Sequence, residues 1–73
     1  MSRRIFYFLK THSKDEGINY LQIRSEEMIL LGNIRCLPPY DRLSRIIKIE
    51  TLEADLRKII DSLKIGEITK IEF

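Results

Sequence analysis

A chain of 73 residues with a net charge of +2 has room for one small domain, which we place at residues 1–73. Its composition, 44% hydrophobic and 33% charged, excludes a disordered chain, and no apolar run is long enough for a membrane span. The single cysteine, Cys36, excludes an internal disulfide and favours a reducing, cytoplasmic location. Because the core of so short a chain is small, a protein partner or a second copy is a common source of added stability.

The first predicted element is a strand at residues 2–10. Ile5, Tyr7 and Leu9 point to one side of this strand, and two phenylalanines between them point to the other side. Apolar residues on both sides are typical of a central strand or of a strand with one side at an interface.

Two further strands are expected after a polar loop at residues 11–17. Residues 18–24 alternate between the two sides of a strand, and residues 28–35 are interpreted as the next strand. The Ser-Glu-Glu sequence between them also matches a helix start, so a short helix at 25–31 is the alternative.

The last third of the chain predicts a strand, a helix and a strand in close succession. Two prolines make residues 36–41 a loop, and the β-branched segment 45–50 favours a strand. A helix capped by Thr51 follows, and Gly66 separates it from a final strand at 68–73. The helix has one apolar stripe, formed by Leu52, Leu56, Ile59, Ile60 and Leu63.

These elements predict an α+β fold with the order β-β-β-β-α-β. We expect a small, mainly antiparallel sheet of four to five strands, with one long amphipathic helix on one face. If residues 25–31 are helical, the order becomes the ferredoxin-like β-α-β-β-α-β.

Residues with catalytic potential are few, and we expect a protein that is not an enzyme and has no metal or cofactor. The only histidine, His12, lies in a charged loop, and no nucleophile is evident beside it. Arg35 could lower the pKa of the neighbouring Cys36, but a structural thiol is the preferred interpretation. The three glycines are isolated, so none belongs to a phosphate-binding loop.

Nucleic-acid binding is the alternative function. Arg3, Arg4 and Lys10 flank the aromatic segment 6–8, and such a pattern suits single-stranded RNA or DNA in a regulatory or viral protein. Residues 1–48 carry nine Lys and Arg against five Asp and Glu, while residues 49–73 are net acidic. Because acidic residues are interspersed, we expect this binding to be weak or absent.

Several short segments resemble the capping-linker domain of phycobilisomes. They are residues 4–8, 19–20, 39–42 and 67–71. That family has paired glycines before its last strand, where this chain has only Gly66, and its spacing after the proline-tyrosine pair is shorter. The chain is therefore not assigned to the family, and the resemblance implies only a protein-binding role.

The preferred function is a small non-catalytic interaction or assembly module that self-associates or docks on a larger protein. One helix can cover only one face of a sheet, so one side of the first strand lacks a cover, and the final strand offers an edge for pairing. The candidate interface residues are Phe6, Tyr7, Phe8, Tyr40 and Phe73.

Overall fold

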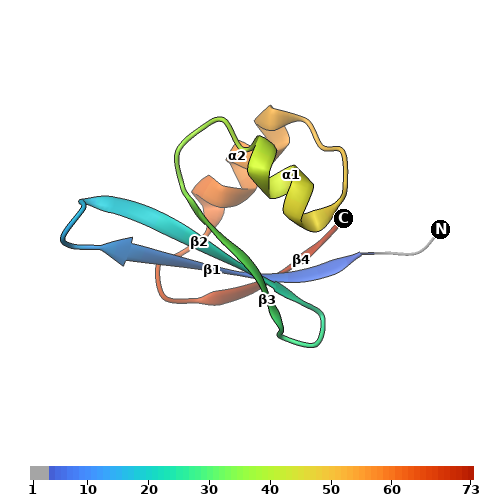
Figure 1. Ribbon diagram of the computed structural model, residues 1–73, viewed down its shortest axis with the longest axis horizontal. Helices are drawn as coiled ribbons and strands as arrows, with labels where there is room; N and C mark the ends of the chain where they lie inside the picture. Colours follow the sequence, from blue (N-terminus) through green and yellow to red (C-terminus); the bar gives the residue numbers. More distant parts are fainter. Residues whose placement is uncertain (1–3) are drawn as a thin grey trace.

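The computed structural model describes residues 4–73 and has a four-stranded antiparallel sheet and two helices (Figure 1). The elements in chain order are β1 (Ile5–Ser13), β2 (Ile18–Ser25), β3 (Leu30–Arg35), α1 (Asp41–Ile47), α2 (Glu53–Ser62) and β4 (Ile68–Glu72). The strands lie in the order β3-β2-β1-β4. The predicted α+β class and antiparallel sheet are confirmed, although the observed element order is β-β-β-α-α-β.

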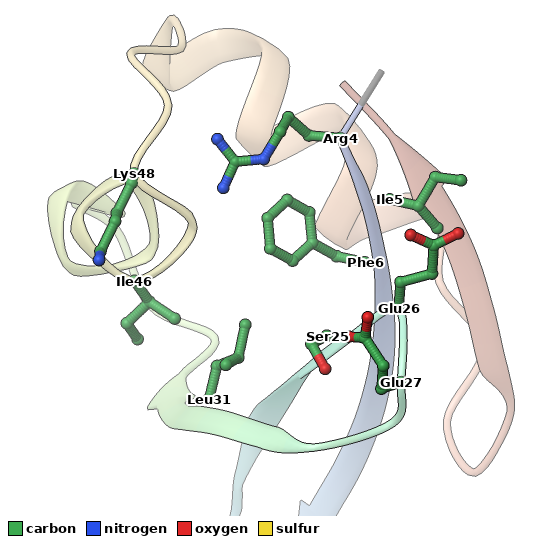
Figure 2. Close-up of a pocket in the computed structure, with 9 residues that line it drawn as sticks. All are labelled: Arg4, Ile5, Phe6, Ser25, Glu26, Glu27, Leu31, Ile46 and Lys48. Carbon is green, nitrogen blue, oxygen red and sulfur yellow. The ribbon is translucent and has the colours of Figure 1, made fainter. Parts of the chain in front are cut away.

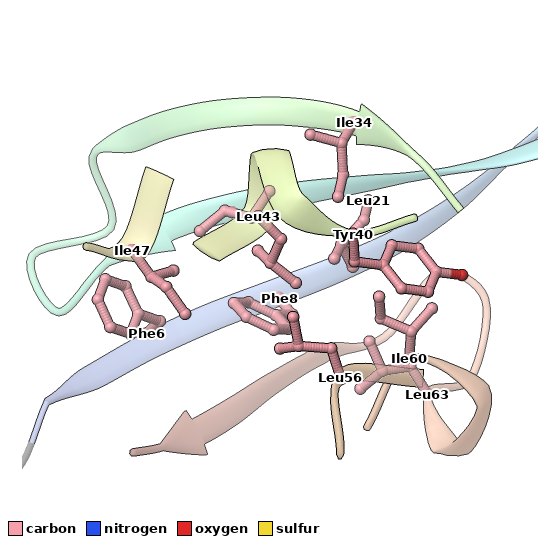
Figure 3. Close-up of a cluster of buried hydrophobic side chains, with 11 residues drawn as sticks. Phe6, Phe8, Leu21, Ile34, Tyr40, Leu43, Ile47, Leu56, Ile60 and Leu63 are labelled. Carbon is pink, nitrogen blue, oxygen red and sulfur yellow. The ribbon is translucent and has the colours of Figure 1, made fainter. Parts of the chain in front are cut away.

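Both helices lie on the same side of the sheet (Figure 1). We call this side the covered face and the opposite side the open face. The core fills the space between the helices and the covered face (Figure 3). Its buried residues are Phe6, Phe8, Leu21, Ile23, Ile34, Tyr40, Leu43, Ile47, Leu56, Ile60 and Leu63.

β1 is a central strand, as its apolar residues on both sides predict. It pairs with β2 on one side and with β4 on the other. Phe6 and Phe8 point to the covered face, where their exposed fractions are 5% and 0%. The strand continues to Ser13, beyond the predicted end, so part of the expected loop is strand. Gly17, at φ 68°, closes the turn and donates from its N–H to the carbonyl of Ser13.

The β2–β3 connection is a turn, so the alternative helix at 25–31 and the ferredoxin-like order are wrong. The N–H of Met28 donates to the carbonyl of Ser25, and the N–H of Ile29 donates to the Ser25 hydroxyl. These bonds, with Met28 in the left-handed region at φ 67°, reverse the chain over too few residues for a helix. β3 begins at Leu30 and is therefore shorter than predicted.

The predicted strand at 45–50 is wrong, because its first residues belong to α1. Leu43 and Ile47 are four residues apart and both are buried, as on one face of a helix. The helix ends where Lys48 takes a left-handed conformation and donates its N–H to the carbonyl of Ser44. The spacing of apolar residues therefore outweighs the β-branched composition. The sheet has four strands, and the expectation of a single helix was also wrong.

α2 agrees with the predicted helix, and its inner residues are buried as expected. Leu56 and Ile60 contact the core, and Leu63 is buried just after the last turn. Leu52 departs from the predicted stripe, since 73% of its surface is exposed at the N-cap position that Thr51 was expected to occupy. None of the helices described within residues 4–73 has the length and apolar character needed to cross a bilayer.

Candidate functional site

Three of the five candidate interface residues are core residues, so their predicted surface role is wrong. Phe6, Phe8 and Tyr40 are buried beneath the helices. Phe73 is half-buried, with its ring 5.9 Å from that of Phe6, and so helps to close the core. Tyr7 is half-buried on the open face, and its role in binding stays a prediction.

The predicted nucleic-acid residues are not brought together on one surface. The guanidinium of Arg4 lies 5.7 Å from the centre of the Phe6 ring and donates to the carbonyl of Ile47 at 3.4 Å. The amine of Lys10 donates to the carbonyl of Ile60 at 3.1 Å. Both cations therefore stabilise carbonyls in the last turns of α1 and α2, where the helix dipole favours positive charge. Arg3 lies outside the described residues.

His12 and Cys36 stand in one row across the sheet with Asn19 between them. The imidazole Nδ1 of His12 lies 2.7 Å from the side-chain oxygen of Asn19, and the backbone N–H of Cys36 donates to the carbonyl of Asn19. Because two strand spacings separate the chain at His12 from the chain at Cys36, their backbones are about 10 Å apart. This order places the amide, and not the imidazole, next to the cysteine.

The surroundings of Cys36 favour its protonated form. Burial raises the pKa of the thiol, and the carboxylate of Asp61 adds to this, while Lys10 opposes it. An activated cysteine needs a lowered pKa, so Arg35 does not have the effect considered from the sequence. In residues 4–73 there is no group of three His, Cys, Asp or Glu side chains suited to hold a metal ion.

The open face carries a row of apolar side chains. Ile5, Tyr7 and Leu9 of β1 alternate with the buried phenylalanines, and Leu9 lies opposite Ile68 of β4. Tyr20 of β2 lies diagonally beside Leu9, since Leu9 pairs with Gln22. None of these five apolar residues is among those that pack against the core. They form a surface that neither α1 nor α2 covers (Figure 1).

Cations flank the tyrosines of this face. Arg24 of β2 and Lys70 of β4 lie opposite Tyr7 on its two sides, and Arg35 of β3 lies opposite Tyr20. The guanidinium of Arg24 donates to two uncharged oxygens, those of the Met28 backbone at 3.1 Å and the Gln22 side chain at 3.2 Å. An apolar centre with cations beside it suits a partner that is apolar in its middle and acidic at its rim.

One carboxylate belongs to each end of the open face. Glu72 of β4 lies opposite Ile5 and forms an ion pair with Lys70 at 3.4 Å. Glu16, in the β1–β2 turn, accepts a hydrogen bond from the hydroxyl of Tyr20, and this bond raises the pKa of Tyr20. The strands place three cations on this face, Arg24, Arg35 and Lys70, so the face carries more positive than negative side chains.

Most of this surface was missed in the sequence because its residues come from four strands. The alternation of Ile5, Tyr7 and Leu9 was noted, and Tyr20 was placed on one side of its strand. The strand order and the register bring these residues together on one face, and the packing of the helices on the opposite face leaves it open.

Comparison of the chain with family models, with curated proteins and with solved structures found no match. The structure itself defines a small α+β domain, whose antiparallel sheet has helices on one face and an apolar, basic surface on the other.

Proposed function

We propose that the protein is a non-catalytic interaction module that docks on a larger protein through the open face of its sheet. The observation that supports this most is the row of half-exposed apolar side chains outside the core, Ile5, Tyr7 and Leu9. An antiparallel sheet that faces water on one side usually carries polar residues there, whereas an apolar face is typical of a binding surface.

Charge favours a larger partner over a second copy on this face. Arg24, Arg35 and Lys70 outnumber the two carboxylates of this face, which are Glu72 on β4 and Glu16 at the β1–β2 turn. Two copies stacked through their open faces would bring these cations toward one another, and like charges at an interface cost several kcal/mol. A partner with an apolar centre and an acidic rim meets no such cost.

Photo-crosslinking at the open face tests this function. A benzophenone amino acid in place of Tyr7, in the cells from which the protein comes, is expected to give protein adducts of discrete mass. The same probe in place of Lys58, exposed on α2, is the control and is expected to give none of these adducts. Adding Ile68→Asp should remove the adducts formed at position 7, because it places a carboxylate opposite Leu9, within the apolar surface.

The outcome decides between docking and other uses of this face. Equal adducts at positions 7 and 58, or no adducts at position 7, would show that the open face does not bind a protein. Circular dichroism of Ile68→Asp must match the parent protein, and its 52% exposure leads us to expect that it does.

Binding of single-stranded nucleic acid is a second candidate function, and the arrangement of tyrosines and cations on the open face favours it. Tyr7 and Tyr20 lie on the open face with cations opposite them, and exposed rings beside cations can stack bases and hold phosphates. Fluorescence anisotropy with single-stranded oligonucleotides tests it, since phosphate contacts make affinity fall steeply with salt. Tight, salt-sensitive binding that Tyr7→Ala and Arg24→Ala both weaken would replace protein docking as the function.

A further inference from the structure

A groove lies at one end of the molecule, between the start of β1, the β2–β3 turn and α1 (Figure 2). Its volume is about 410 Å³. Phe6, Leu31 and Ile46 supply apolar side chains to its lining. Leu31 is 42% exposed, so this groove presents apolar surface that the core does not use.

Opposite charges stand on two sides of this groove. Arg4 and Lys48 lie on one side, and Figure 2 shows the Arg4 guanidinium turned into the groove. Glu26 and Glu27, in the β2–β3 turn, lie on the other side. Two cations and two carboxylates therefore balance within one surface, in contrast to the positive open face.

An exposed apolar segment follows the two glutamates of the β2–β3 turn and projects beside the acidic side of the groove. Residues 28–31 follow the two glutamates directly, and their exposed fractions lie between 41% and 62%. This segment, which we call the hairpin tip, is held by hydrogen bonds to Ser25 from Met28 and Ile29. Because the tip is already ordered, binding through it costs little conformational entropy.

We propose that the hairpin tip of one copy docks in the groove of a second copy, giving a two-fold symmetric dimer. In such an interface residue i of one copy contacts residue j of the other, and j contacts i, so the surface must be complementary to itself. This surface meets that condition in two ways. The apolar tip of one copy matches the apolar groove of the other, and the carboxylates beside the tip match the cations beside the groove.

In the dimer, Glu26 and Glu27 of each copy lie toward Arg4 and Lys48 of the other. The apolar tip of each copy covers the exposed part of Leu31 and the side chain of Ile46 in the other copy. This arrangement leaves the central residues of the open face uncovered, so a dimer presents two such faces to a larger partner. Two linked binding faces raise the effective affinity for a partner with repeated sites.

A pair of charge-reversed variants of the full chain tests the interface by sedimentation equilibrium, over micromolar to millimolar concentrations. One variant carries Arg4→Glu and Lys48→Glu, and the other carries Glu26→Lys and Glu27→Lys. Each variant alone is expected to dimerise at least about thirtyfold more weakly than the parent, because like charges then face each other across both halves of the interface. An equal mixture is expected to recover dimers, since every reversed charge meets an opposite one.

Two further variants separate the interface from general effects of charge and folding. Arg57→Glu with Lys58→Glu makes the same charge change on the exposed side of α2 and is expected to leave the dimer intact. Ile29→Asp, at a side chain that is 62% exposed, should weaken the dimer while the circular dichroism spectrum stays unchanged. This variant keeps the test valid if Arg4→Glu unfolds the chain through its contacts with Phe6 and Ile47.

A parent protein that stays monomeric at millimolar concentration would overturn the proposal. So would a dimer that Ile29→Asp leaves unchanged and Ile68→Asp disrupts, because this result assigns the dimer to the open face. Failure of the dimer does not affect docking on a larger protein, which the crosslinks at position 7 test separately.

Discussion

Consecutive residues of β1 lie in two different environments. Phe6 and Phe8 are buried against the helices, whereas Tyr7 and Leu9 lie half-buried on the open face. Tyr7 lies between Arg24 and Lys70 there. The two sets are similarly apolar, so hydrophobicity alone does not distinguish core from surface in this strand. The difference shows that the side on which the helices pack determines which apolar residues stabilise the fold and which remain for a partner.

The largest expected effect comes from truncating a core ring of β1. Phe8→Ala should lower the free energy of unfolding by about 3–5 kcal/mol, because it leaves a cavity where the side chain is fully buried. The matched change Leu9→Ala, one residue along the strand, should cost about 1 kcal/mol. Urea unfolding followed by circular dichroism measures both, with Phe8→Leu as a milder variant if the alanine variant does not fold. Equal losses would contradict the distinction between the two faces.

The helix that covers the sheet should show a similar contrast. Leu56→Ala and Ile60→Ala should each cost about 2–5 kcal/mol, because both side chains are about 99% buried in the core. Leu52→Ala should cost less than about 0.5 kcal/mol, since the side chain is mostly exposed, and the same holds for Arg57→Ala and Lys58→Ala. A large loss at Leu52 would mean that the helix packs through a different face.

A single carboxylate ties the two helices together. Glu53 in the first turn of α2 accepts the N–H of Tyr40 at the start of α1, with oxygens at 2.7 and 3.1 Å. Glu53→Ala should cost about 1–3 kcal/mol, because it leaves this N–H without its charged acceptor. Asp55→Ala removes a carboxylate from the same helix turn without breaking this bond and should cost only about 0.5 kcal/mol. Equal losses in thermal unfolding would assign the effect to helix charge alone.

The smallest effect concerns stability at high pH. Burial raises the pKa of Cys36 above its ordinary value of 9.0 and the pKa of Tyr40 above 10.0. The folded chain then holds these protons at a pH where the unfolded chain releases them, so stability is fully present below pH 9.0 and falls as the pH rises through the folded values. The free energy of unfolding, measured at a series of pH values, should show this decline. In Cys36→Ala the free energy of unfolding should begin to fall less steeply with pH. Stability that rises above pH 9.0 would contradict the burial of both groups.

The covered and open faces also explain which site predictions failed. The interface candidates were chosen because they are aromatic. This criterion favours core residues, because aromatic rings bury large apolar areas. Phe6, Phe8 and Tyr40 are such cases. Arg4 and Lys10 were selected by charge, but their positions next to the ends of α1 and α2 give them carbonyl partners within the fold. Neither position is apparent before the helices are placed on the sheet.

Local sequence determined the elements whose signals agree with each other. The apolar run of β1, the alternation in β2 and the 3.6-residue spacing of Leu56, Ile60 and Leu63 predicted two strands and a helix. At 45–50 the signals disagreed, since the residues are β-branched but Leu43 and Ile47 have helical spacing. There the tertiary structure decided for a helix, because burial of both side chains against the sheet outweighs a weak intrinsic preference for strand. It also decided which face of the sheet stays open, because that depends on contacts between segments distant in the chain, which no local pattern contains.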